Sequence, residues 1–188
     1  MAVLQLKPKA KLYKRYPLAS ILIYNASTIV HFALGGIGII IGYSLWSGVA
    51  SSVGIIYLLF AFGEMYFLMP FAVCPNCVYY RLEGGLCISG LNVVSRKLAQ
   101  PGRVKNLARR SQGLLCPNNL YMASLLLPLV VLIPAMIINF SWSLLSIFVV
   151  IAGLLVFRFF VIFPKLACLH CYAKYKCPQA GMMGVRDL

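Results

Sequence analysis

The sequence predicts an all-α membrane protein in which four transmembrane helices form two hairpins. Hydrophobic residues make up 62% of the 188 residues and charged residues only 11%, whereas a soluble domain is about half apolar and about a quarter charged. Four apolar stretches also reach the length of about 20 residues that a helix needs to cross a bilayer. We therefore expect one integral membrane domain that covers residues 1–188.

The predicted spans are separated by two short connections and one long one. Basic residues precede the first span, but its apolar run is far longer than the roughly 7–15 residues of a signal-peptide core, which indicates a retained anchor. The short connections, near Ser47 and Ser141, carry no charge, so each pair of spans is expected to form a hairpin. The four spans are residues 17–46, 49–73, 120–140 and 142–163.

Small residues and prolines inside the spans predict how the helices pack. Gly38 and Gly42 would let another helix backbone approach the first span closely, either within the bundle or in a homodimer. Pro128 and Pro134 in the third span each remove a backbone N–H. The carbonyl groups freed one turn earlier either line a ligand cavity or have no such role.

The distribution of charge predicts the orientation of the chain. Of the 17 Lys and Arg residues, only Arg158 lies inside a predicted span. The others lie in the N-terminal tail, in the loop 74–119 and in the tail 164–188, so the positive-inside rule assigns the N-in/C-in topology of an inner or plasma membrane protein. In this setting, 17 basic residues against three acidic ones indicate anionic lipid headgroups as partners, and not nucleic acid.

Two basic stretches of the loop are expected to form short amphipathic helices. They are Leu91–Ala99 and Arg103–Leu115, with Pro101-Gly102 as the break between them. Such helices lie on the membrane surface with their apolar side chains in the interface. The alternative is a docking surface for an acidic soluble protein.

Six of the seven cysteines form two similar clusters, and each cluster follows a predicted span. A CxxC turn aims two sulfurs at one point, and two such turns build the sulfur site of zinc or of an iron–sulfur cluster. Because the cytoplasm keeps thiols reduced, structural disulfides are not expected. The clusters are Cys74-Pro-Asn-Cys77 with Cys87, and Cys168-Leu-His-Cys171 with Cys177; Cys116 precedes the third span.

The division of these ligands between sites is open in the sequence. One site would use Cys74, Cys77, Cys168 and Cys171. Two sites would use all seven cysteines together with His170 or an external ligand. Iron–sulfur is the leading cofactor and zinc the alternative, and thiol–disulfide chemistry is a third possibility. The two-site division is Cys74, Cys77, Cys87 and Cys116 against Cys168, Cys171, Cys177 and His170.

Ionisable residues inside the spans are candidates for proton handling. By helix geometry, His31 lies about 20 Å and Glu64 about 15 Å from the cytoplasmic ends of their helices. An unpaired, ionised glutamate at that depth costs several kcal/mol, so we expect a structural His31–Glu64 hydrogen bond or, as the functional interpretation, proton delivery to a quinone. Arg158 is expected to snorkel to lipid phosphates, with pairing to Glu64 as the alternative.

Together these features predict a membrane-embedded iron–sulfur protein that relays electrons between a cytoplasmic donor and a quinone-type carrier, as part of a complex. The alternatives are a zinc-stapled structural or assembly subunit and a thiol-exchange or metal-handling protein. The sequence contains no P-loop, GxSxG, HExxH or GxGxxG motif. With only three acidic residues, catalysis by a pair of carboxylates is also not expected.

Overall fold

The described part of the chain is all-helical. The computed structural model describes residues 10–43, 47–104, 116–175, 177, 180–181 and 183–186, without the side chains of residues 47–51. In these ranges the only β pairing is an isolated bridge between Arg15 and Leu86. Four helices are long and apolar enough to cross a membrane, which confirms the predicted number of spans. They are Leu18–Gly42, Ser52–Asn76, Pro117–Ile138 and Trp142–Cys168.

Two of these four helices contain π-helical segments. The second consists of α2 (Ser47–Gly63), the π-helical η2 (Glu64–Leu68), α3 (Met69–Ala72) and the 3₁₀ turn η3 (Cys74–Asn76). The fourth consists of α8 (Trp142–Phe157) and the π-helical η4 (Arg158–Cys168), so it extends beyond the predicted end at residue 163. The other helices are α1 (Leu18–Gly42), α4 (Val78–Arg81), α5 (Leu91–Leu98) and α7 (Pro117–Ile138).

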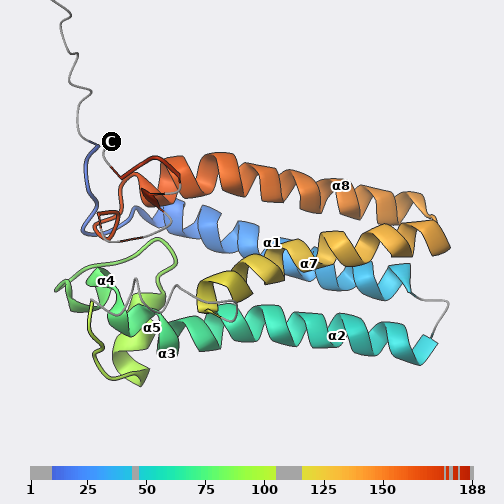
Figure 1. Cartoon of the computed structure of the whole chain (residues 1–188), viewed down its shortest axis with the longest axis horizontal. Helices are drawn as coiled ribbons and strands as arrows, with labels where there is room; N and C mark the ends of the chain where they lie inside the picture. Colours follow the sequence, from blue (N-terminus) through green and yellow to red (C-terminus); the bar gives the residue numbers. More distant parts are fainter. Residues whose placement is uncertain are drawn as a thin grey trace, which may run out of the picture.

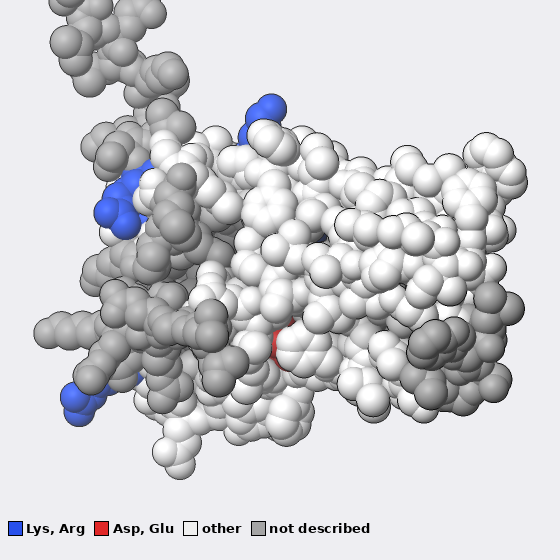
Figure 2. Space-filling model, turned by 45° about the vertical axis from the view of Figure 1, so that its right-hand side comes forward, with Lys and Arg blue, Asp and Glu red and all other residues white. Residues whose placement is uncertain are grey.

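The long helices lie side by side, and α1 is the centre of the bundle. It contacts α2, α7 and α8. The end of α1, the start of α2 and the connection between α7 and α8 lie at one end of the bundle, whereas α3, α4, α5 and the C-terminal segment lie at the other (Figure 1). The two cysteine clusters therefore meet at the same end, as the hairpin arrangement requires. Most of the visible Lys and Arg side chains also lie toward that end, and the rest of the surface is largely uncharged (Figure 2).

The glycines of α1 are used for packing inside the bundle. A Cβ atom on Gly35 would lie 2.9 Å from Pro128 Cβ, and one on Gly42 would lie 2.7 Å from Ala135 Cβ. Both distances are shorter than van der Waals contact, so the absence of a side chain is what allows α7 to approach α1. This supports packing within the bundle for the predicted glycine face.

Side chains from α1 and α2 pair with carbonyl groups of α7 one turn before Pro128. Pro128 leaves the carbonyl of Ser124 without its helical donor, and the Tyr57 hydroxyl donates to that oxygen at 3.0 Å. His31 Nε2 donates to the next carbonyl, that of Leu125, at 2.9 Å. These carbonyls therefore hold the bundle together through protein contacts, and a role in lining a ligand cavity is not found for them.

The predicted surface helix at Leu91–Ala99 is present as α5. Val93, Val94 and Leu98 are exposed and the basic Arg96 and Lys97 lie in its last turn, which is the amphipathic pattern of an interfacial helix. Most of the second predicted surface helix, Arg103–Leu115, lies outside the described residues.

Candidate functional site

The two CxxC segments have the same backbone turn. The Cys77 N–H donates to the Cys74 carbonyl at 3.0 Å, and the Cys171 N–H donates to the Cys168 carbonyl at 3.2 Å. Each segment immediately follows or ends a long helix, so each turn is anchored by a helix that is long and apolar enough to cross a membrane. The similarity between the clusters in the sequence is therefore also a similarity of local structure.

The second cysteine of each turn also accepts a backbone hydrogen bond. The Ala173 N–H donates to Cys171 Sγ at 3.3 Å, and the Tyr79 N–H pairs in the same way with the Cys77 thiol. Both donors lie two residues after their cysteine. An N–H aimed at sulfur stabilises the thiolate, which is the form that binds metals.

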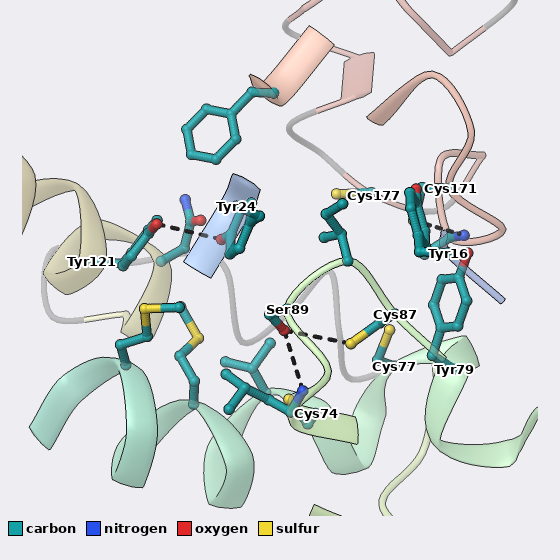
Figure 3. Close-up of a pocket in the computed structure, with 18 of the residues that line it drawn as sticks. Tyr16, Tyr24, Cys74, Cys77, Tyr79, Cys87, Ser89, Tyr121, Cys171 and Cys177 are labelled. Atoms are coloured by element: carbon teal, nitrogen blue, oxygen red, sulfur yellow. Dashed lines mark hydrogen bonds between the residues drawn. The ribbon is translucent and has the colours of Figure 1, made fainter. Parts of the chain in front are cut away.

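Cysteines from both clusters line one cavity of about 270 Å³. Figure 3 shows their side chains around this cavity, with those that follow η2 and those that follow η4 facing each other across it. The sequence thus correctly indicates that thiols from distant segments meet at one end of the bundle. The cysteines that line the cavity are Cys74, Cys77, Cys87, Cys171 and Cys177.

Burial controls the ionisation of two thiols of this cavity, Cys77 and Cys171. Burial raises the pKa of Cys77 to about 11, the Tyr79 N–H opposes that shift, and the thiols of Cys87 and Cys177 add to it. The pKa of Cys171 is also raised, again chiefly by burial, with the Ala173 N–H acting in the opposite direction. Without a bound cation, both thiols are therefore protonated at neutral pH.

The cavity thiols do not converge on one point. Among the described residues, no three His, Cys, Asp or Glu side chains are close enough together to hold a metal ion. The number and type of donors around the cavity fit a sulfur-ligated centre, but their present side-chain positions are not those of a formed site. A joint metal site therefore stays a prediction.

Three of the predicted ligands lie outside the cavity lining. Cys116 is buried and caps α7, because its Sγ accepts from the Asn119 N–H at 3.3 Å. The Cys168 thiol faces Met183 Sδ at 3.9 Å. His170 is stacked on Tyr13 with 4.4 Å between ring centroids, and its Nδ1 donates to a backbone carbonyl.

His31 and Glu64 are both buried, but the predicted hydrogen bond between them is wrong. Both carboxyl oxygens of Glu64 and the Nδ1 atom of His31 have no hydrogen-bond partner among the described residues. His31 instead uses Nε2 to donate to the Leu125 carbonyl, which fixes the Nε2–H tautomer and leaves a lone pair on Nδ1. Neither residue lines the cysteine cavity.

Arg158 does not snorkel to the membrane surface and does not pair with Glu64. Its side chain is only 1% exposed. The guanidinium donates to the Tyr121 hydroxyl, to Thr28 Oγ1 at 2.5 Å and to Ser27 Oγ at 3.1 Å. A buried cation is thus surrounded by neutral hydroxyl groups inside the bundle.

Aromatic side chains join this buried cation to the cysteine cavity. The guanidinium carbon lies 5.4 Å from the ring centroid of Tyr24, 5.9 Å from that of Tyr121 and 5.8 Å from that of Phe163, and all three residues line the cavity. The sequence analysis did not identify this group. The signal was present in α1, where Tyr24, Thr28 and His31 have the spacing of one helix face.

The chain matches no protein-family model, and no curated protein or solved structure is detectably similar to it.

Proposed function

We propose that this protein relays electrons between a soluble cytoplasmic donor and a quinone-type carrier in the membrane, as one subunit of a larger complex. One observation carries the proposal: cysteines that follow the second transmembrane helix and cysteines that follow the fourth line the same cavity. Sulfur ligands from two separate segments are typical of iron–sulfur and zinc sites. An iron–sulfur cluster bound there would supply one-electron transfer.

The ligands would come from the five cavity cysteines, since such a cluster takes four thiolates. Cys74 and Cys77 would contribute from one side and Cys171 and Cys177 from the other, with Cys87 as the remaining candidate. These side chains would have to turn toward a common point, because no three of the described ones converge. The Tyr79 and Ala173 N–H groups would stabilise the resulting thiolates.

The basic end of the bundle supports the proposed sidedness and the proposed partners. Lys14, Arg81, Lys97 and Arg103 are exposed there, and the positive-inside rule assigns this end to the cytoplasm. Its charge would bind anionic lipid headgroups and would steer an acidic electron-donor protein toward the cavity.

Glu64 and His31 would handle protons in this proposal. Glu64 is 4% exposed and its oxygens have no hydrogen-bond partner among the described residues. A carboxyl group in such a place is most stable when it holds a proton, because desolvation penalises the charged form. His31 Nδ1, also buried and unpaired within the described chain, is a second site that can accept one.

The proposal is tested by purifying the full-length protein without oxygen and measuring iron, sulfide, zinc and visible absorption. We expect stoichiometric iron and sulfide, and a visible absorption band that bleaches on reduction. Cys77→Ser and Cys171→Ser should each lose the band and the iron. Cys116→Ser is the matched control, because Cys116 caps α7 outside the cavity and serine is a good N-cap.

Zinc remains the second candidate, because the cavity thiols come from both hairpins and a zinc ion would join the hairpins together. A colourless protein with stoichiometric zinc would overturn the electron-relay proposal and support this structural role. A metal-free protein whose cavity cysteines form disulfides on mild oxidation would overturn both and support thiol exchange.

A further inference from the structure

We infer that the side of the cavity opposite the cysteines binds a quinone head group through the phenols of Tyr24 and Tyr121. This inference rests on the proposed function for its biological meaning, because it locates the membrane carrier in the same cavity as the thiols. The binding itself is independent of whether the cysteines hold a metal. In the view of Figure 3, Tyr24 and Tyr121 lie on one side of the cavity and Cys87, Cys77 and Cys171 on the other.

A directed chain of hydrogen bonds ends in the cavity. The Arg158 guanidinium can only donate, so the Tyr121 oxygen accepts from it. The Tyr121 and Tyr24 hydroxyls are 3.3 Å apart, and either of them can donate to the other. In both cases the pair uses one of its two phenol protons internally. The other proton is left to donate to an acceptor in the cavity that both residues line.

Arg158 makes this chain a strong donor without touching the ligand. A cation at one end of a hydrogen-bond chain polarises the O–H groups along it. Because Arg158 is not part of the cavity lining, a permanently charged anion would not reach it. The arrangement instead suits a neutral carbonyl oxygen whose negative charge grows on reduction, as it does in a quinone.

The remaining lining suits a flat, apolar ring. Met65 and Met69 line the cavity from the second transmembrane helix and Phe163 from the fourth. A mostly apolar lining with a few convergent polar groups is the usual composition of small-molecule sites, and methionine sulfur packs well against aromatic rings. At about 270 Å³, the cavity is smaller than the roughly 300–1,000 Å³ of pockets that enclose drug-sized ligands. It would therefore take the head group and leave the isoprenoid tail in the lipid.

The experiment measures binding of decylubiquinone to the full-length protein in detergent by calorimetry, with metal-free and metal-loaded samples. Tyr121→Phe should weaken binding roughly tenfold, because it disconnects the donor chain from Arg158. Tyr24→Phe should cost less, since the Tyr121 hydroxyl can then donate directly. The double variant should bind most weakly. Tyr43→Phe is the control, because its hydroxyl pairs with the Val131 carbonyl away from the cavity.

A photoreactive azidoquinone provides the second measurement and does not depend on the variants being stable. We expect adducts on the peptides that contain Tyr24, Met65 or Tyr121, and competition by decylubiquinone. Equal binding by the wild type and the double variant, adducts confined to the lipid-facing surface, or a phospholipid in the cavity that decylubiquinone does not displace would each overturn the inference. If the purified protein binds decylubiquinone but holds no iron, only the proposed electron relay is overturned. If it holds iron but binds no decylubiquinone, only the quinone site is overturned.

Discussion

The hydroxyl of Tyr57 in α2 donates a hydrogen bond of 3.0 Å to the carbonyl oxygen of Ser124 in α7. That carbonyl lies four residues before Pro128 and therefore lacks its helical donor. In a hydrocarbon environment a free carbonyl has no water to bind. A side chain from one hairpin thus supplies the hydrogen bond that a backbone carbonyl of the other lacks. The stability of the second hairpin therefore depends on the first.

Tyr57→Phe should consequently lower the free energy of unfolding by about 0.5–2 kcal/mol, the range found for hydrogen bonds between transmembrane helices. The measurement is unfolding in mixed detergent micelles followed by circular dichroism. Tyr175→Phe, at an exposed tyrosine, is the control and should leave the curve unchanged. Identical curves for the two variants would contradict the role given to the Tyr57 hydroxyl.

Gly35→Ala should destabilise the bundle by about 1–3 kcal/mol, as overpacking does in other cores. The new Cβ would lie 2.9 Å from both Pro128 Cβ and the Tyr57 hydroxyl oxygen, so α7 or Tyr57 must move. Gly153→Ala is the matched control, because a Cβ there meets nothing within 4 Å and alanine favours a helix over glycine. Thermal unfolding in the same detergent distinguishes the two, and a stable Gly35→Ala protein would show that the helices are not closely packed.

Thr28→Val should be more destabilising than Ser27→Ala. Thr28 Oγ1 is fully buried and accepts from Arg158 at 2.5 Å, whereas Ser27 Oγ is partly buried and accepts at 3.1 Å. Losing the first acceptor leaves a guanidinium N–H unpaired in the interior, which costs about 1–3 kcal/mol. The order of the two unfolding free energies is the readout, and the reverse order would mean that Arg158 readily finds another acceptor.

Alkylation of Cys77 in metal-free protein should depend steeply on pH. Only the thiolate reacts, and burial raises the pKa of Cys77 to about 11, so the rate should keep rising until about that pH. In the unfolded protein the rise should level off near the ordinary thiol pKa of about 8.5. Iodoacetamide labelling followed by mass spectrometry of the Cys77 peptide gives both profiles.

The same shift has a consequence for stability. The folded state favours the neutral Cys77 thiol, so its contribution is complete below the unfolded pKa of about 8.5 and is lost as the pH rises toward about 11. The free energy of unfolding of metal-free protein should fall over that interval. A Cys77→Ala variant should show a smaller fall, and equal slopes would contradict the assigned burial.

The sidedness proposed for the chain can be measured directly. Because the basic residues flank the spans at the end that carries the C-terminal segment, a fluorescent protein fused after residue 188 should fold and fluoresce in the cytoplasm. Alkaline phosphatase fused at the same position should be inactive. Fused at a charge-free turn, such as that near Ser141, it should be active. The opposite pattern would reverse the topology.

The fold was largely predictable because span length and apolar composition are properties of continuous sequence. The end of the fourth helix was not, since Pro164 and Lys165 indicate the end of a span but instead lie within the π-helical η4. A π turn accommodates the proline by shifting the hydrogen-bond register, and such a shift has no simple sequence signal.

The candidate site was predictable only in part. Matching clusters at the ends of two helices correctly indicated a shared location for Cys74, Cys77 and Cys171. The contacts of His31, Glu64 and Arg158 were not predictable, because counting along a helix gives a depth in the membrane and not the direction in which a side chain points. That direction depends on the rotation of each helix against its neighbours.

A π-helical segment leads into each cysteine cluster: Glu64–Leu68 precedes the first, and Arg158–Cys168 ends at the first cysteine of the second. A π turn accommodates one residue more than an α turn, and one residue corresponds to about 100° of rotation around a helix axis. Deleting a single residue from Glu64–Leu68 would thus convert the π segment into an α turn and largely preserve the direction of Cys74 and Cys77. Deleting one residue from α3, Met69–Ala72, would instead swing both thiols away from Cys171 while every thiol remained in the chain. For this protein, an insertion or deletion in α3 should be more harmful than most substitutions, because it changes the direction of both thiols at once, whereas the π segment before it can absorb one residue.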